Sequence, residues 1–454
     1  MVLLRVDTPG TSFRSLQGKG VRFLYEMPNI GALFNRLAWV ASIPPNTTSA
    51  SLMAVDGLAS VEDDVEHPLS APRPFQRLRD LSARMLSQVL SPFPSDVTDV
   101  ARQFPLGAEG LISGRPVDKQ RFLDMGDVRH ILDQVQAPQA WRSNKGESAI
   151  IVVVDTGVQG ELVPAWQKAG GWTDIPKGDP WVDDIGHGSL VAMLAASDPD
   201  TNGYSGVAPK AKIFSLKPRP GPRGGITASS VLLGFDFLLG LQLPPGTKVV
   251  VNGSWGLWGC SNEIFPCNVL PVRLVEKLAG MNAVQTVWAI GNSNKMCGGA
   301  PSAWCINTSP ASLSVGAVGK DLRSHFYSAH GFGQCSLLHP SIVAPTYGAV
   351  PYGSGFIDFK SQGAGTSAVA PLGAGAMAIL WTAHPKATTR ELRAAVRMGA
   401  AKLSAGIIGL PFYDPIYGAG LLQIERSIRL LPYARFHPSY YMERLRLPKR
   451  RPVG

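Results

Sequence analysis

Apolar segments with no polar alternation are the feature that most restricts the fold of this chain. AIIVVVDTGV, at residues 149–158, is the clearest of them. A strand with one face in water alternates apolar and polar residues, whereas a strand buried on both faces does not. Similar runs occur at residues 211–216, 248–255, 283–292 and 312–319. These segments predict strands of a parallel sheet that is covered on both faces.

Segments with helical spacing separate these strands, at residues 189–197, 228–241 and 268–281. Strands that alternate with helices form parallel βαβ units. We therefore expect an α/β fold, a doubly wound, mostly parallel sheet with helices on both faces. In such sheets, ligands and chemistry collect at the carboxyl ends of the strands. The residues that follow each strand are the first candidates for function.

The sheet pattern occupies residues 131–430, and the rest of the chain differs from it. Residues 1–68 predict a small α+β domain. Its strands are expected at 20–27, 37–44 and 59–67, and its helix at 49–58. Residues 69–130 are basic and contain proline, with one helical pattern at about 74–90, which indicates a linker or an insertion. Residues 431–454 predict a basic C-terminal tail.

The chain carries a formal net charge of +10, and part of the excess lies in ERLRLPKRRPVG at residues 443–454. A basic tail can contact nucleic acid or acidic lipid, but composition favours a solvated tail. No recognition motif accompanies the charge, so nucleic acid is not an expected partner. No apolar run reaches the roughly 18–20 residues of a membrane span, and the start MVLLRVDTPGTSF lacks the apolar core of a secretory signal. We expect a protein without a membrane span, cytoplasmic rather than exported.

Five cysteines lie in one part of the chain: Cys260, Cys267, Cys297, Cys305 and Cys335. Their spacing does not match a zinc ribbon or knuckle. Two disulfides that close short loops, with one thiol left over, are typical of an oxidising compartment. The missing secretory signal instead favours free thiols. Both alternatives stay open.

An aspartate and a histidine occupy two places where such a sheet concentrates chemistry. Asp155 directly follows a buried apolar run, where a carboxylate needs a cation or a hydrogen-bond donor. His187 lies between two glycines at the start of a helix of small residues, and the glycines allow other backbone to approach its ring. Taken singly, each has a structural alternative: a turn former for Asp155 and a surface histidine for His187.

An asparagine and a serine complete a set of four. Asn292 follows a strand and a glycine, and its amide can donate a hydrogen bond to an oxygen that gains negative charge. Ser367 lies in GAGTSAVAPLGAGA, at the expected start of a helix, where its own N–H points outwards. Together the four residues permit acyl transfer. In that reaction Ser367 attacks a carbonyl, His187 moves the proton, and Asp155 stabilises the imidazolium.

SDPDTNGYSG, at residues 197–206, begins like a calcium loop of the EF-hand type. Its candidate ligands are Asp198, Asp200 and Asn202. The glutamate expected at the twelfth position of such a loop is replaced by Pro209. A structural calcium ion and a plain turn are both open, and the chemistry above requires no cofactor.

Five motifs occur in order along the chain: DTG, GHGS, SWG, IGN and GTSAVAP. They resemble the signature blocks of the subtilisin-like serine proteases (subtilases), and the similarity covers about residues 130–428. The resemblance implies a serine endopeptidase that cleaves protein or peptide substrates through an acyl-enzyme. It assigns Asp155, His187 and Ser367 as the catalytic triad and Asn292 as the donor of the oxyanion hole. It assigns substrate contacts to Ser254, Trp255, Gly256, Ala289, Ile290 and Gly291.

The chain departs from the family pattern beside these residues. Ser189, Leu190 and Met193 stand in GHGSLVAM, where GHGTHVAG is usual in the family. Leu372 stands where a histidine is usual after the serine. These positions lie outside the triad, so they affect the assignment of a subgroup more than that of the activity. Trp255 is bulkier than the usual residue and is expected to narrow or cap a subsite.

Two alternatives compete with an active subtilase. The related sedolisins share the fold but use a glutamate where this chain has His187, which argues against them. A catalytically silent scaffold that binds a protein partner would need a distorted or blocked site. The N-terminal unit also resembles the inhibitory propeptide of many subtilases. This resemblance implies an intramolecular inhibitor, with a cut shortly after His67.

Overall fold

The computed structural model describes residues 128–443 with short gaps, and pieces of the N-terminal region: 2–6, 16, 19, 21–26, 37–42, 58–63 and 66–67. The gaps within 128–443 are 221–225, 257–266, 268–269, 281, 283, 295–301, 304, 332, 334, 337, 347–348, 353–354, 359–364 and 405–411. The expected linker up to residue 127, the helix expected at 49–58 up to residue 57, and the last residues, 444–454, lie outside the described residues.

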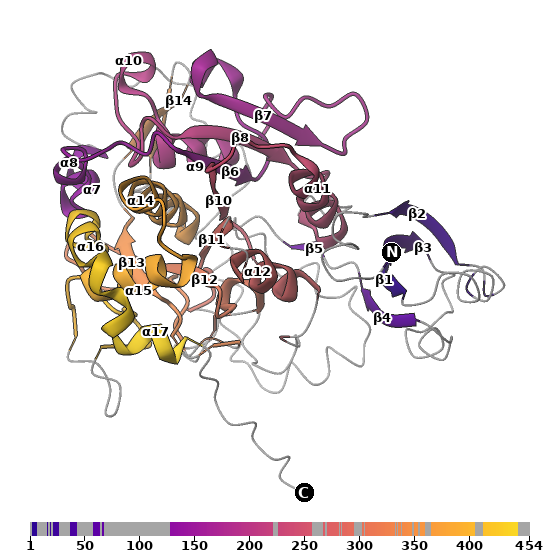
Figure 1. The fold of residues 1–454 in the computed structure, drawn as a ribbon. Helices are drawn as coiled ribbons and strands as arrows, with labels where there is room; N and C mark the ends of the chain where they lie inside the picture. Colours follow the sequence, from indigo (N-terminus) through magenta and orange to yellow (C-terminus); the bar gives the residue numbers. More distant parts are fainter. Residues whose placement is uncertain are drawn as a thin grey trace, which may run out of the picture.

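Seven parallel strands form the central sheet, in the order β13-β12-β11-β10-β6-β8-β7 (Figure 1). Their bounds are β6 Ala149–Val154, β7 Lys168–Thr173, β8 Lys212–Lys217, β10 Lys248–Gly253, β11 Val284–Ala289, β12 Ser312–Val318 and β13 Ile342–Pro345. Five of these strands confirm the apolar runs of the sequence. The two edge strands were not expected, because β7 contains two glycines and is half-exposed, and β13 has only four residues.

Helices cover both faces of this sheet (Figure 1). Ile151 and Val153 of β6 pack in one core with α9 (His187–Ala196) and α14 (Ala370–Ala383). Val152 and Val154 pack in a second core with α11 (Ala228–Gly240) and α12 (Leu270–Gly280). Successive residues of one strand thus lie in different cores, which explains why the strand shows no polar alternation. The doubly wound α/β fold is confirmed.

Shorter elements connect and flank these layers. Before and within the first half of the sheet they are α7 Val128–Gln134, α8 Ala137–Ala140, η3 Gly160–Leu162, η4 Ala165–Gln167, α10 Pro199–Asn202 and β9 Ile226–Thr227. In the second half they are η5 Cys305–Thr308, β14 Ala349–Tyr352, β15 Gly355–Asp358, η6 Gly365–Ala368, α15 Thr389–Gly399 and α16 Ile424–Leu430. Strands β14 and β15 form an antiparallel hairpin.

The N-terminal pieces form a separate antiparallel sheet of four strands, in the order β2-β3-β1-β4. The bounds are β1 Val2–Val6, β2 Arg22–Glu26, β3 Leu37–Ser42 and β4 Leu58–Asp63. Three of these strands confirm the sequence pattern, and β1 was not expected. The last expected strand is divided in two, because β5 (Glu66–His67) leaves this sheet and pairs antiparallel with β9.

The folded region continues beyond residue 430, where the sequence predicted a basic tail. The chain forms η7 (Leu431–Phe436) and then α17 (Pro438–Met442). Glu443 follows, buried, and its carboxylate accepts hydrogen bonds from Arg393 and Arg397 of α15. Buried ion pairs of this kind hold the segment against the domain, so the boundary predicted at residue 430 is wrong for residues 431–443.

One helical segment of the described chain, Gly365–Ala383, has the length and mean hydropathy of a membrane span. It comprises the turn η6 and helix α14, and 89% of its most apolar window is buried inside the domain. The sequence interpretation overlooked it, because its apolar character comes from glycine and alanine rather than from a run of large side chains. In this fold the helix packs against β6, β10 and β11.

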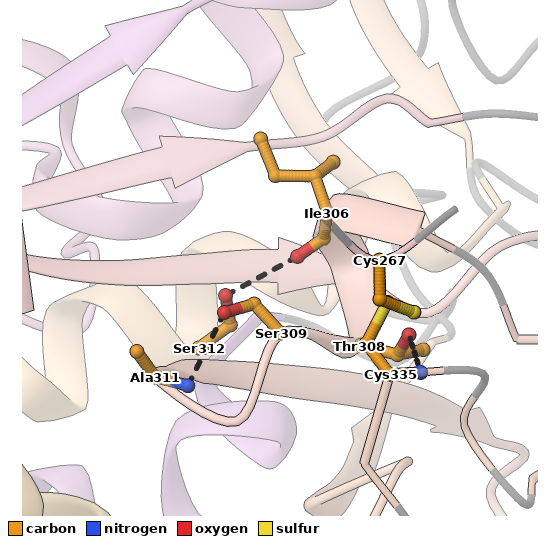
Figure 2. Close-up of a disulfide and its surroundings, with 7 residues drawn as sticks. All are labelled: Cys267, Ile306, Thr308, Ser309, Ala311, Ser312 and Cys335. Atoms are coloured by element: carbon orange, nitrogen blue, oxygen red, sulfur yellow. Dashed lines mark hydrogen bonds between the residues drawn. A yellow bond between two sulfur atoms is a disulfide. The ribbon is translucent and has the colours of Figure 1, made fainter. Parts of the chain in front are cut away.

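A disulfide joins Cys267 to Cys335, whose Cα atoms lie 5.4 Å apart (Figure 2). The two cysteines are 68 residues apart in the chain. The N–H of Cys335 also donates to Thr308 Oγ1, at 3.1 Å, which places the bridge beside η5. The sequence left short-loop disulfides and free thiols open, and neither alternative holds for these two cysteines, because tertiary packing brings distant segments together. The remaining cysteine side chains, of Cys260, Cys297 and Cys305, lie outside the described residues.

Candidate active site

The candidate residues gather at the carboxyl edge of the sheet, next to β6. From β6 the chain first forms β7 and β8 on one side, and then returns to form β10 to β13 on the other. This reversal is the position at which doubly wound sheets open a crevice. Asp155 directly follows β6, and Ser254 directly follows β10, its neighbour in the sheet. The topology therefore brings together residues that are about 100 positions apart in the sequence.

Asp155 and His187 form a buried pair. The imidazole Nδ1 of His187 lies 2.8 Å from Oδ1 of Asp155, which also accepts the N–H of Thr156 at 2.8 Å. Only 1% of Asp155 is exposed, and 10% of the His187 side chain. Burial lowers the pKa of His187, but the carboxylate of Asp155, by its charge and its hydrogen bond, outweighs this effect and raises the pKa above its usual value. The pair is thus suited to accept a proton at the imidazole.

Glycines on both sides of His187 allow the backbone to pack closely. Gly186 is the N-cap residue just before α9, and its φ of 85° favours glycine. A Cβ atom on Gly188 would lie 2.1 Å from the carbonyl oxygen of Gly157 and 3.0 Å from Cβ of Asp155. A larger residue at Gly188 would push the helix away from the loop that follows β6. The sequence expectation that these glycines admit close backbone therefore has a direct structural basis.

Ser367 lies in the 3-10 turn η6, whereas α14 begins only at Ala370. The serine is buried, and its Oγ donates to the carbonyl oxygen of Ser254 at 2.9 Å. Ser254 Oγ in turn donates to the carbonyl oxygen of Ser367 at 3.0 Å. Because η6 also contacts α9, the turn lies next to the helix that carries His187. Serine and histidine are therefore brought to the same edge of the sheet.

The side chain of Asn292 is oriented by the residue before the serine. Its Oδ1 accepts hydrogen bonds from the N–H of Thr366 at 2.8 Å and from Thr366 Oγ1 at 3.0 Å. Thr366 Oγ1 also accepts the N–H of Gly291, at 3.0 Å. The amide oxygen is thus held by Thr366, and the amide nitrogen is the donor end of this side chain. Gly365 is required beside it, because a Cβ atom there would lie 2.2 Å from that nitrogen.

The indole of Trp255 is buried in the core instead of lining an exposed wall. Its exposed fraction is 1%, and its Nε1 donates to the carbonyl oxygen of Val154 at 2.9 Å. The ring packs edge-on against Trp288, with centroids 4.8 Å apart. Buried in this way, the Trp255 side chain does not provide the cap on a subsite that the sequence led us to expect. Its backbone, like that of Ala289, remains a predicted contact for substrate.

Asn307 links the two segments that were predicted to contact substrate. Its Nδ2 donates to the carbonyl oxygens of Trp255, at 3.0 Å, and Ala289, at 2.5 Å. A Cβ atom on Gly256 would lie 2.6 Å from the same nitrogen. The side chains of Ala289 and Ile290 are themselves buried. Sequence reasoning missed Asn307, because no local pattern marks an asparagine that joins two strand ends.

Asp183 and Thr156 were also missed, although both stand beside predicted residues. Asp183 lies four positions before His187 in DDIGHGS, and Thr156 is the middle residue of DTG. The two are joined by a hydrogen bond of 2.7 Å from Thr156 Oγ1 to Asp183 Oδ1. The only sign of Asp183 in the sequence was that an acidic residue other than Asp155 lies in the short, glycine-containing segment before His187.

The segment that the sequence left open as a calcium loop or a plain turn forms the short helix α10. Asp198 caps it by accepting from the N–H of Thr201, and its carboxylate pairs with Lys210 at 3.1 Å. The same ammonium lies 3.9 Å from Asp200. Asn202 donates its amide to the carbonyl oxygen of Leu162. An ammonium group thus faces both carboxylates, and this arrangement favours the plain turn; calcium stays an untested prediction. Among the described residues, no group of three or more His, Cys, Asp or Glu could hold a metal ion.

Comparisons with known proteins show which family this chain resembles. The model of the subtilase family matches residues 146–420. Mycosin-3 of Mycobacterium tuberculosis (strain ATCC 25618 / H37Rv) is 31% identical over 131 residues, which cover 27% of this chain and 28% of that protein. Subtilisin E of Bacillus subtilis (strain 168) is 24% identical over 303 residues, 66% of this chain and 71% of that protein.

The fold is also similar to a solved structure, that of fervidolysin from Fervidobacterium pennivorans, described as a keratinolytic enzyme related to subtilisin. The TM-score is 0.61 at 18% sequence identity, and the match covers 94% of this chain and 60% of that one. The chain therefore spans less than two thirds of mycosin-3 and of fervidolysin. Because the family model covers more than half of the chain, including the loops after β6, β10 and β11 and the turn η6, this protein belongs to the subtilase family.

Proposed function

We propose that the chain is a serine endopeptidase in which Ser367 is the nucleophile and Asp155 and His187 complete the triad. The observation that carries the proposal is the buried Asp155–His187 pair, with 2.8 Å between carboxylate and imidazole, beside the turn that holds Ser367. A histidine with this partner accepts a proton readily and keeps a single tautomer. Family membership supports peptide-bond hydrolysis as the reaction.

In the proposed reaction the Ser367 hydroxyl turns from the Ser254 carbonyl towards His187. Its oxygen attacks the substrate carbonyl carbon while His187 accepts the proton, and Asn292 donates to the oxygen that becomes negative. The tetrahedral intermediate then expels the amine, which takes the proton from His187, and leaves an acyl-enzyme. Water, activated by the same histidine, hydrolyses the ester. Asp155 stabilises the imidazolium in both steps.

Active-site labelling tests this assignment. A fluorophosphonate probe forms a covalent adduct with an activated serine, so we expect one labelled peptide, containing Ser367. Ser367→Ala should abolish both labelling and peptide hydrolysis, and Ser205→Ala, a partly exposed serine outside the site, should leave both unchanged. If the full-length and the N-terminally trimmed protein both fail to label, the chain is a silent scaffold and the proposal is wrong.

We further propose that the N-terminal region inhibits the site within the same chain. The supporting observation is the antiparallel pairing of β5 with β9, in which Glu66 faces Thr227 and His67 faces Ile226. Adding a strand to an exposed edge is a common way to bind an extended peptide. On this proposal a substrate peptide pairs with the same edge, and the segment that ends at His67 competes with it.

A proline tests this pairing, because proline removes the backbone N–H that a strand pair needs. His67→Pro should increase the rate of fluorophosphonate labelling in the full-length chain several-fold. Glu66→Ala keeps the backbone intact and should label like the unchanged protein. Equal labelling rates for all three proteins would argue against inhibition through this strand.

A further inference from the structure

Asp183 is a buried carboxylate that the proposed reaction does not use. It is 6% exposed and lies in the loop before α9, four residues before His187. Its two oxygens accept five hydrogen bonds, which occupy all of the roughly four lone-pair sites of a carboxylate. The donors to Oδ1 are Thr156 Oγ1 (2.7 Å), Ile185 N (3.2 Å) and Gly186 N (2.9 Å), and the donors to Oδ2 are Ser189 N (2.7 Å) and Ser189 Oγ (2.6 Å).

One side of this carboxylate holds the histidine turn. Gly186 precedes His187 and Ser189 follows it by two residues, and the backbone N–H of each donates to Asp183. The start of α9 is therefore fastened on both sides of the imidazole. The hydroxyl of Ser189, which stands where the family usually has threonine, makes a third bond to the same carboxylate. This serine retains the hydroxyl that the carboxylate needs.

The other side holds the aspartate. Thr156 follows Asp155 directly, and its hydroxyl donates to Asp183 and accepts the N–H of Gly188, at 2.9 Å. The loop after β6 and the start of α9 are thus joined through one carboxylate and one hydroxyl. Because Asp155 and His187 lie on these two segments, the same group sets the distance between them.

The negative charge of Asp183 also acts on the imidazole. Burial lowers the pKa of His187, and Asp155 raises it. The charge of Asp183 is a further, smaller cause that raises this pKa. Among the described residues no lysine or arginine forms an ion pair with Asp183, and Lys217 of β8 pairs instead with Asp184. Besides β8, three elements with described side chains contact α9: they are β6, η6 and α14. None of these three carries an ionisable side chain.

We propose that Asp183 is a positioning residue for the Asp155–His187 pair. It fastens the two segments that carry the pair, and its charge stabilises the imidazolium that forms when Ser367 gives up its proton. The catalytic consequence of this inference rests on the proposed function. The effect of Asp183 on the pKa of His187 does not require that the protein hydrolyses a substrate.

The test compares Asp183→Asn with Asp184→Asn in the full chain. Both changes remove one negative charge at neighbouring positions, but the Asp184 side chain is 76% exposed and accepts none of the bonds above. For Asp183→Asn we expect kcat to fall about 10- to 100-fold, as for a misplaced catalytic group, with little change in KM. The acid limb of the kcat/KM profile should move to lower pH by up to about one unit. Asp184→Asn should have the same kcat and the same acid limb as the unchanged protein.

A direct titration separates this inference from the proposed function. The imidazole of His187, assigned by comparison with His187→Gln, is titrated by NMR in the unchanged chain, Asp183→Asn and Asp184→Asn. We expect a lower pKa only in Asp183→Asn. If the unchanged chain does not hydrolyse peptides, the proposed function fails while this titration still decides the inference. An unshifted titration in Asp183→Asn, or an equal shift in Asp184→Asn, overturns it.

Thr156→Val provides a second variant if Asp183→Asn does not fold. Valine has nearly the same shape as threonine but lacks the hydroxyl that joins Asp183 to Gly188. Because the hydroxyl is lost, we expect kcat to fall several-fold. Because the charge of Asp183 is retained, the acid limb of the pH profile should not move. A kcat equal to that of the unchanged protein would refute the positioning role.

Discussion

Replacing Glu443 should lower the stability of the domain more than any change at a surface ion pair. The carboxylate accepts from Arg393 Nε and Arg397 Nη1, both at 2.8 Å, and from Arg393 Nη2 at 2.9 Å. All three side chains are 4% exposed or less. Burial raises the pKa of Glu443, but the two guanidinium groups outweigh it and hold the pKa below its usual range. The carboxylate is therefore ionised at neutral pH.

The expected magnitude follows from this burial. Removing one partner of a buried ion pair leaves an uncompensated charge and typically costs about 3–5 kcal/mol. Glu443→Ala leaves two guanidinium groups in that state, so we expect a loss at the upper end of this range. At roughly 2 °C per kcal/mol for a domain of this size, the midpoint of thermal unfolding should fall by about 10 °C. Glu443→Gln retains the shape and one acceptor and should cost less.

A matched control is Glu425→Ala, which removes the exposed pair of Glu425 with Arg429 on α16. Exposed pairs of this spacing contribute about 0.3–0.5 kcal/mol. Both variants are measured by thermal unfolding in the Ser367→Ala background, which prevents self-digestion. If Glu443→Ala unfolds within about 2 °C of Glu425→Ala, the buried network does not stabilise the domain and the reasoning is refuted.

The same network makes a pH prediction whose sign can be checked. A carboxyl group with a lowered folded-state pKa stabilises the fold above its unfolded pKa, near 4.3, and loses this contribution as pH falls through the folded value. The stability difference between the unchanged protein and Glu443→Gln should therefore be constant from pH 5 to 7 and shrink below about pH 4. A difference that instead grows on acidification would contradict the assigned direction.

Three further changes test other parts of the structure. Gly365→Ala should lower peptide hydrolysis by at least about 100-fold, because a Cβ atom there meets Asn292. It should also cost about 1–3 kcal/mol of stability, since φ is 66°. Normal turnover would contradict this. Burial and two nearby guanidinium groups hold the pKa of His339 well below its usual value. The free energy of unfolding, measured in urea, should therefore fall as the pH drops below about 6.5, by at most about 1.4 kcal/mol per pH unit. His339→Gln should flatten that slope. Replacing Cys267 and Cys335 by alanine opens a loop of 68 residues and should cost about 4 kcal/mol in urea unfolding, and a loss below 1 kcal/mol would count against a stabilising bridge.

The sequence by itself determined the layers of the fold and the positions of four candidate residues. A strand between two helical layers must be apolar on both faces, so the run before Asp155 marks such a strand without any knowledge of its neighbours. His187, Asn292 and Ser367 were found for the same local reason. Each lies at the start of a helix, at the end of a strand or in a glycine-rich turn, and these places are encoded within a few residues of sequence.

Only the tertiary structure decided how those places are joined. Trp255 donates to a carbonyl 101 residues away and therefore lies in the core instead of at the surface. Asp183 connects the loop after β6 to the start of α9, and Cys267 meets Cys335 across 68 residues. Glu443 folds back onto α15, although its surroundings in the sequence are those of a basic tail. In each case the partner is distant along the chain, and local patterns report how a residue is buried but not which residue buries it.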